Sequence, residues 1–211
     1  MEPRLEQQAR GTRILIGKDA AIRREILSYL IEDAESYGCQ EIILPSIEPV
    51  DIYIDKAGNE ILKQMYTFPD KKGRLLCLRP EATATCQLLA DEVFSRDNDV
   101  KLWYETRCYR YERPQAGRYR EFVQFGVEVL NPKETTYESL IELAKRMIMV
   151  GEEDGYELDK SAVRGLDYYV GDGFEISIPS LGAQKQVCGG GKYKQGFGFA
   201  IGLDRLVLAE T

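Results

Sequence analysis

Apolar residues recur at helical spacing in two long stretches of the chain. The first begins near Asp19, a possible helix cap, and ends at Gly38; its repeating residues are Ile22, Ile26, Tyr29, Leu30 and Tyr37. The second covers residues 136–150 and repeats Leu140, Leu143, Ala144, Met147 and Ile148. Shorter helices are predicted over residues 82–94 and 203–209. The pattern therefore predicts several helices that each bury one face.

Short apolar or alternating runs between these stretches predict strands. They cover residues 42–44, 65–68, 75–78, 101–110, 119–128, 174–178, 186–188 and 197–201. The segment 42–44 is predicted to be buried and to end at Pro45, whereas the polar segment 155–160 is predicted to be a linker. Strands that follow one another through short turns favour an antiparallel sheet. We expect an α+β fold, an antiparallel sheet flanked by helices, in a single domain over residues 1–211.

Composition narrows the classes of function. The 211 residues are 44% hydrophobic, contain no apolar run near the ~20 residues of a membrane span, and begin without a signal-peptide core. Five scattered cysteines without a C-x-x-C pair indicate reduced thiols and a cytoplasmic location. The chain has no histidine, which excludes Ser-His, Cys-His and histidine-ligated metal chemistry. A net charge of −7 limits any nucleic-acid contact to a local surface.

Arginines gather in the loop between the two predicted strands 101–110 and 119–128 and at the strand ends beside it. They are Arg110, Arg113, Arg118 and Arg120, around a turn that contains Pro114 and Gly117. Arginine holds phosphate well because its planar guanidinium donates two parallel charge-assisted hydrogen bonds. A solvated hairpin loop is the alternative interpretation of this charge run.

The segment 109–128 resembles motif 2 of class II aminoacyl-tRNA synthetases, in the form found in histidyl-tRNA synthetases. The family pattern is F-R-x-E-R-P-Q-x-G-R-Y-R-x-F-x-Q-x-G-x-E, and the chain follows it closely. Five further strings resemble family signatures in the same order. They are residues 38–53 (motif 1), L-R-P-E-A-T at 78–83, V-R-G-L-D-Y-Y at 163–169, L-G-A-Q-K-Q-V-C-G-G-G-K-Y at 181–193, and F-A-I-G-L-D-R-L at 199–206 (motif 3).

The resemblance implies an enzyme that activates an amino acid, with histidine favoured, using ATP and Mg²⁺. It implies ATP contacts from Arg110, Glu112, Arg118 and Arg205, with Arg110, Arg164 and Arg205 acting in catalysis. It implies amino-acid contacts from six residues: Glu81, Thr83, Gln124, Glu128, Arg164 and Tyr169. No protein ligand is assigned to the metal. Taken singly, Glu81 could instead be a helix-terminal carboxylate, Tyr169 a core tyrosine, and Arg205 a surface residue.

The chain also departs from the family pattern. Family members carry an inserted domain between motif 2 and R-G-L-D-Y-Y, and a carboxy-terminal anticodon-binding domain. Here a short stretch joins Glu128 to Arg164, the sequence ends at Thr211, and G-G-R-Y-D is replaced by G-G-K-Y-K at 190–194. Two alternatives therefore stay open besides a minimal histidyl-tRNA synthetase-like ligase. One is a non-catalytic regulatory paralogue that binds ATP phosphoribosyltransferase, and the other is an adenylating enzyme whose acceptor is not tRNA.

The motif 1 segment also predicts a homodimer. Residues 39–53 combine an apolar strand with Ile47, Val50, Ile52 and Tyr53. An apolar strand edge that is left uncovered promotes aggregation, and the same segment of a second copy of the chain would cover it. Cover by a helix of the same chain is the alternative.

Overall fold

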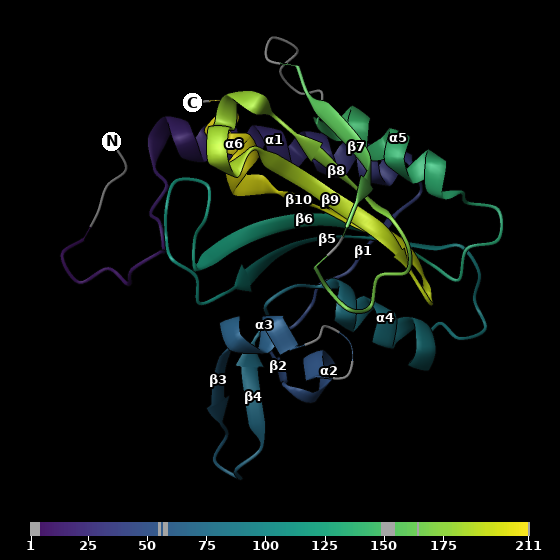
Figure 1. Ribbon diagram of the computed structural model, residues 1–211, viewed down its shortest axis with the longest axis horizontal. Helices are drawn as coiled ribbons and strands as arrows, with labels where there is room; N and C mark the ends of the chain where they lie inside the picture. Colours follow the sequence, from purple (N-terminus) through teal and green to yellow (C-terminus); the bar gives the residue numbers. More distant parts are fainter. Residues whose placement is uncertain (1–4, 55, 57–58, 149–154, 164, 211) are drawn as a thin grey trace.

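The computed structural model describes residues 5–54, 56, 59–148, 155–163 and 165–210. Among them, seven strands form one sheet in the order β1-β5-β6-β10-β9-β8-β7 (Figure 1). Their bounds are β1 Gln40–Glu41, β5 Val100–Tyr109, β6 Glu121–Leu130, β7 Glu157–Ala162, β8 Gly173–Ser177, β9 Gln186–Tyr193 and β10 Gly196–Gly202. The strand β1 pairs with β5 in parallel, and every other neighbouring pair is antiparallel. The predicted antiparallel α+β fold is confirmed.

A second, three-stranded sheet projects from the main body. It has the order β2-β4-β3, with β2 Ile47–Pro49, β3 Tyr66–Pro69 and β4 Leu75–Leu78. The short helices α2 Asp51–Ile54 and α3 Asn59–Gln64 lie beside it (Figure 1). The turn between β3 and β4 is held by Asp70, whose carboxylate accepts the backbone N–H groups of Lys72 and Arg74 at 2.8 and 2.9 Å. The strands predicted over residues 65–68 and 75–78, on either side of this turn, are confirmed.

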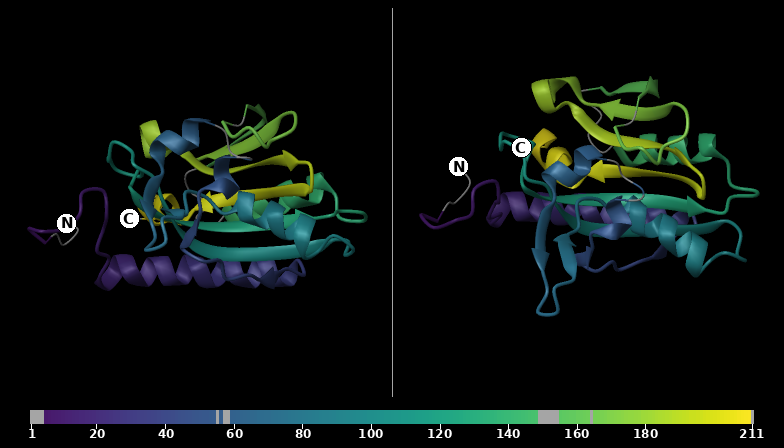
Figure 2. Two further views of the ribbon diagram at one scale, coloured as in Figure 1. Left: turned by 90° about the horizontal axis from the view of Figure 1, so that it is seen from below. Right: turned by 60° about the horizontal axis from the view of Figure 1, so that its bottom comes forward.

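Three helices cover one face of the large sheet. They are α1 Gly17–Ser36, α5 Tyr137–Ile148 and α6 Leu203–Ala209, and Figure 2 shows α1 running along this face. Their apolar side chains pack against Val123, Phe125, Val127 and Val129, which alternate along β6. All five apolar residues predicted to point inward from α5 are buried. This face of the sheet is the main hydrophobic core.

The intervening residues of the same strands face the other side, which holds the site described below. Helix α4, Thr83–Glu92, covers only one end of that face, where Ala90 packs with Leu102, Leu130 and Tyr193. The rest stays uncovered between α4, the loop that follows β5, and the 3₁₀ helix η1, Pro179–Gln184. Alternation along β5 and β6 thus separates the core from the site.

Two predictions near the amino terminus are wrong. Helix α1 begins at Gly17, so Asp19 lies in the first turn and does not cap it. Residues 42–44 form no strand, and Ile43 is 85% exposed. The reason is local: the N–H of Ile42 still bonds to the carbonyl of Trp103 at 2.9 Å, and the chain then leaves the large sheet to enter the small one. The predicted end of α1 is correct, because Gly38 adopts φ +87° just beyond it.

Two further boundaries differ on the carboxy-terminal side. The segment predicted as a polar linker overlaps β7, an edge strand that leaves most of its residues exposed to solvent and therefore lacks an apolar pattern. Strand β9 is longer than predicted, since Gly189, Gly190 and Gly191 continue it in regular register with β10. No helix in the described part of the chain is long and apolar enough to cross a membrane.

Candidate active site

A cavity of about 580 Å³ opens on the uncovered face of the sheet. Its wall is formed by motif 2, the start of α4, the 166–169 segment, η1, β9 and the start of α6. Eight of the residues predicted for the site line it: Glu81, Thr83, Arg110, Glu112, Arg118, Gln124, Tyr169 and Arg205. Segments far apart in the sequence therefore meet at one place. Arg164 lies outside the described residues.

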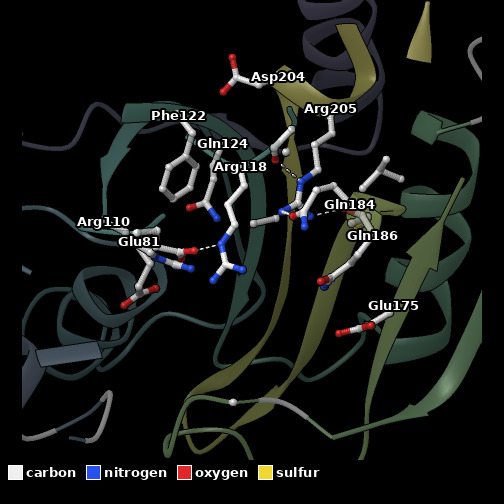
Figure 3. Close-up of a pocket in the computed structure, with 18 of the residues that line it drawn as sticks. Glu81, Arg110, Arg118, Phe122, Gln124, Glu175, Gln184, Gln186, Asp204 and Arg205 are labelled. Atoms are coloured by element: carbon white, nitrogen blue, oxygen red, sulfur yellow. Dashed lines mark hydrogen bonds and ion pairs between the residues drawn. The ribbon is translucent and has the colours of Figure 1, made fainter. Parts of the chain in front are cut away.

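One half of the cavity is strongly basic. Figure 3 shows Arg110, Arg118 and Arg205 pointing toward a shared space. Arg110 donates through Nε to the carbonyl of Pro80 at 2.9 Å, and its guanidinium lies 5.3 Å from the ring centre of Phe122. Arg118 forms an ion pair with Glu112. These contacts hold both side chains at the ends of the motif 2 loop, which we define as residues 110–120.

Arg205 comes from the first turn of α6 and completes the basic half. Its Nε donates to the carbonyl of Gly117 at 2.8 Å, and one terminal nitrogen donates to Oε1 of Gln184 at 3.1 Å. Another bond reaches the carbonyl of Gln186. Burial lowers the pKa of Arg205, and the nearby charges of Arg118 and Arg110 lower it further. Three cations held this close together favour an anionic ligand between them.

The other half of the cavity contains a buried carboxylate at the start of α4. Glu81 accepts the backbone N–H groups of Thr83 at 2.7 Å and Ala84 at 3.1 Å, and the hydroxyl of Tyr168 at 3.2 Å. Burial raises its pKa, and the bonds to Ala84, the charge of Arg110 and the bond to Thr83 oppose the rise. Glu81 thus fixes the start of α4 and still faces the cavity.

Glu128 lies one layer deeper and is fully buried. Its Oε1 accepts the hydroxyl of Thr83 at 2.6 Å, and its Oε2 accepts the hydroxyl of Tyr193 at 2.6 Å. The hydroxyl of Tyr104 lies 3.4 Å from Oε1. Burial raises the pKa of Glu128 to about 7, although these hydrogen bonds oppose the rise. The structure therefore places Glu128 behind Thr83 rather than among the residues that line the cavity.

Tyrosine rings border this acidic half of the cavity. The rings of Tyr168 and Tyr169 lie 4.5 Å apart, and Tyr168 meets Tyr193 edge-on at 6.3 Å. A Cβ at position 191 would lie 2.6 Å from the ring of Tyr169, so the glycine there makes room for that ring. Gln124 also lines the cavity, and its side-chain oxygen accepts a hydrogen bond from the thiol of Cys108 at 3.1 Å.

Sequence reasoning missed several residues of the site. Tyr168 and Tyr193 lie inside two of the quoted signatures, so the same strings could have identified them. Tyr104 could have been found from its alternation with Leu102 along β5. Gln184 and Gln186, which hold Arg205, lie inside the quoted string 181–193 but were not singled out. The buried Arg79, Glu48 and Tyr53 lie inside the strings 78–83 and 38–53, and the hydroxyl of Tyr53 reaches the carbonyl of Glu81 at 3.1 Å.

The described residues contain no cluster of three or more histidine, cysteine or acidic side chains that could hold a metal by themselves. Glu175 is one acidic side chain that lines the cavity, across from Arg205 (Figure 3). Mg²⁺ at nucleotide sites is usually held by one or two carboxylates together with phosphate oxygens, and this arrangement fits that mode.

Comparison with known proteins identifies the family. The family model described as histidyl-tRNA synthetase matches residues 11–149, more than half of the chain. The chain belongs to the histidyl-tRNA synthetase family. It is 29% identical to the histidine–tRNA ligase of Archaeoglobus fulgidus over 306 aligned positions, which cover 95% of this chain and 75% of that relative. The alignment is longer than the 211 residues of the chain, so this family member lacks stretches that the relative carries.

Solved structures agree with this assignment. The apo histidyl-tRNA synthetase of Staphylococcus aureus superposes with a TM-score of 0.79 at 26% identity, covering 97% of this chain and 70% of that one. A Bacillus halodurans protein described as an ATP phosphoribosyltransferase regulatory subunit/histidyl-tRNA synthetase superposes with a TM-score of 0.82 at 17% identity, covering 100% of this chain and 84% of that one. The second likeness shows a shared fold. The family expected from the six strings is confirmed.

Proposed function

We propose that this protein activates histidine with ATP and Mg²⁺ to form histidyl-adenylate, acting in the cytoplasm as a single catalytic domain over residues 1–211. The observation that carries the proposal is one cavity with a cluster of three arginines in one half and a buried carboxylate in the other. ATP is anionic and histidine carries an ammonium group, so each half complements one substrate.

The basic half would hold the triphosphate. Arg110 and Arg118 lie at the two ends of the motif 2 loop, and Arg205 faces them from α6. Glu112, which lines the cavity and pairs with Arg118, is assigned to the adenine. Arg110 is assigned to the α-phosphate and Arg205 to the γ-phosphate. Mg²⁺ would be bound mainly by the phosphates, with Glu175 as a candidate carboxylate.

The acidic half would hold the amino acid. An ammonium group needs acceptors, and Glu81, Thr83 and Gln124 offer them at the cavity surface. Imidazole needs a partner for each ring nitrogen. Tyr169 is at the surface, whereas Glu128 would act directly or through the hydroxyl of Thr83. Two buried carboxylates with raised pKa values favour a substrate that brings positive charge.

The chemistry then requires alignment more than proton transfer. A carboxylate oxygen of histidine attacks the α-phosphorus, the bond from that phosphorus to the β-phosphate bridging oxygen breaks, and pyrophosphate leaves with the bonding electron pair. Arg110 stabilises the charge that builds on the α-phosphate, and Arg164 is assigned to the same region. Holding the reactants in line supplies the rest of the rate acceleration.

Exchange of labelled pyrophosphate into ATP tests the proposal. We expect exchange with histidine, and none above background with the other nineteen amino acids, because no other standard side chain offers both a donor and an acceptor nitrogen on one ring. A folded sample that gives no exchange with any amino acid would contradict the proposal and favour the regulatory paralogue. A charging assay with tRNA then decides whether tRNA is the acceptor, as the names of the relatives suggest.

We also propose that the protein is a two-fold homodimer that pairs through the motif 1 region. Large apolar side chains are exposed around the small sheet: Ile43, Ile47, Ile54 and Leu75. Ile43 and Ile47 flank the point where the chain passes from the large sheet to the small one. Exposed apolar residues gathered in one region are typical of an interface.

Light scattering tests the dimer. We expect a mass near twice 24.0 kDa at micromolar concentration, and we expect Ile43→Glu to shift the equilibrium toward monomer by about tenfold or more, because it buries a charge. The matched control is Val93→Glu, at an exposed apolar residue beyond the end of α4. A parent protein that stays monomeric at this concentration would contradict the proposal.

A further inference from the structure

The segment that precedes α1 lies against the base of the motif 2 loop. We call residues 5–16 the N-terminal arm. The carbonyl of Gly11 accepts the backbone N–H of Arg120 at 2.8 Å and that of Glu121 at 3.3 Å. The β5–β6 pairing ends at Tyr109 and Glu121, and one further bond, from the N–H of Arg110 to the carbonyl of Arg120 at 2.9 Å, continues it into the loop. The arm therefore adds a second set of backbone bonds at the base of the loop, on the side of Arg120 and Glu121.

Arg13 ties the arm to two parts of the site at once. Its guanidinium forms an ion pair with Asp204, and the two side chains are only 9% and 10% exposed. The same guanidinium stacks 4.0 Å from the ring centre of Tyr119, a residue of the motif 2 loop. The second carboxylate oxygen of Asp204 accepts the N–H of Val123 at 2.7 Å. One side chain of the arm thus connects the loop, the start of β6 and the start of α6.

Asp204 is the direct neighbour of Arg205 in the first turn of α6. The two side chains leave the helix in different directions, with Arg205 entering the cavity beside Arg118 (Figure 3). Because Asp204 is fixed by Arg13 and Val123, the helix turn that carries Arg205 is fixed with it. The nearly buried ion pair would leave an unpaired charge if Arg13 were removed.

A second chain of contacts leads from Gly11 to Arg118. Gly11 has φ +84°, and a Cβ there would lie 2.7 Å from Cγ of Arg120. Arg120 stacks 4.0 Å from the ring centre of Tyr111, and its Nε donates to the carbonyl of Glu112 at 3.0 Å. The side chain of Glu112 in turn pairs with Arg118. Position 11 therefore needs glycine both for its backbone angle and for the space that Arg120 fills.

From these contacts we infer that the N-terminal arm is a clasp that positions the motif 2 loop and Arg205 for ATP, with Gly11 and Arg13 as positioning residues. The inference rests on the proposed function, because it concerns the triphosphate half of the same cavity. Neither residue is among those that line the cavity, so both act through Arg118, Arg120 and Asp204. Loss of the clasp would allow Arg118 and Arg205 to move apart. This would weaken ATP binding and leave the acidic half of the cavity unchanged.

Two pairs of variants of the full chain test the clasp. Gly11→Ala is paired with Gly17→Ala, since both glycines have positive φ but a Cβ at Gly17 would meet nothing within 4 Å. Arg13→Ala is paired with Arg10→Ala, which removes an exposed arginine from the same arm. For Gly11→Ala and Arg13→Ala we expect the KM for ATP to rise about tenfold or more while the KM for histidine changes less than about twofold. Both controls should leave both constants within about twofold.

Amide hydrogen exchange supplies a readout that does not depend on activity. Clasp variants should speed exchange in residues 110–120 but not in α5, which lies on the other face. Loop protection equal to that of the controls, or equal rises in both KM values, would overturn the inference.

If the parent gives no pyrophosphate exchange, the proposed function fails, and the amide data alone decide the clasp. If Gly11→Ala does not fold, Arg13→Gln replaces it, because it leaves the arm's backbone unchanged.

Discussion

Replacing Arg110 by alanine is expected to lower kcat/KM for histidine-dependent pyrophosphate exchange by about 10²–10³-fold. Removing one preorganised donor to a developing charge typically costs about 3 to 4 kcal/mol of transition-state stabilisation. Arg110 is held in place by the carbonyl of Pro80 and by the ring of Phe122, so little reorganisation accompanies the reaction. The fold should survive, because Arg110 is only partly buried and lies outside the main core.

The control for this variant is Arg113→Ala. Arg113 is on the same loop but is exposed, so its loss should change kcat/KM by less than about threefold. The comparison removes one positive charge in both cases and differs only in position. Equal effects of the two variants would show that general loop charge, rather than a specific phosphate contact, drives the reaction.

Replacing Glu128 by glutamine is expected to stabilise the protein at pH 8 and to weaken its binding of histidine. Burial raises the pKa of Glu128 from 4.5 to about 7. A carboxyl whose pKa is raised in the folded state contributes stability below pH 4.5, and that contribution is lost as the pH rises through 7. Ionising Glu128 at pH 8 therefore costs up to about 3 kcal/mol, which a neutral glutamine avoids.

The sign of this effect can be read from thermal unfolding at two pH values. The Tm of Glu128→Gln should exceed that of the parent at pH 8 by several degrees, since about 1 kcal/mol corresponds to roughly 2–4 °C in a protein of this size. The difference should shrink toward zero as the pH falls below 4.5. Glu142→Gln, on the exposed side of α5, should match the parent at both pH values. A less stable Glu128→Gln at pH 8 would mean that this carboxylate is stabilised by its hydrogen bonds.

The same variant should raise the KM for histidine by about 10²-fold. A buried hydrogen-bonding group matched to a polar substrate discriminates strongly, because its replacement leaves one partner unpaired. Glutamine can still bond to Thr83 and Tyr193 but cannot attract positive charge. The KM for ATP should stay within about twofold, since the arginine cluster is unchanged. An unaltered KM for histidine would remove Glu128 from the amino-acid site.

The elements that bury one face were predictable, whereas those at the edges were not. Helix α5 and the β5–β6 pair have apolar residues at regular spacing, so their positions follow from periodicity. Strand β7 is an edge strand with mostly exposed residues, and the segment 42–44 crosses between two sheets. Neither carries a periodic apolar pattern, because most residues of β7 and Ile43 of the crossing segment face solvent.

The residues of the candidate site likewise fall into those that the sequence could predict and those that it could not. Arg110, Glu112 and Arg118 lie in one continuous string, so a sequence motif can find them. The contacts that hold Arg205 and its helix turn join distant segments: Gln184 bonds to Arg205, and Arg13 pairs with Asp204. Such contacts between remote parts of the chain leave no local pattern. The burial of Glu128 behind Thr83 likewise depends on how three strands and α4 come together.

The identity of the product in a single turnover tests the central claim most directly. Excess protein is mixed with ATP, Mg²⁺ and histidine, quenched in acid, and analysed by mass spectrometry. The proposed chemistry predicts histidyl-adenylate and pyrophosphate in equal amounts, and neither product when histidine is omitted. Intact ATP, or ADP and phosphate in place of these products, would contradict the claim that this cavity joins the carboxylate of histidine to the α-phosphate of ATP.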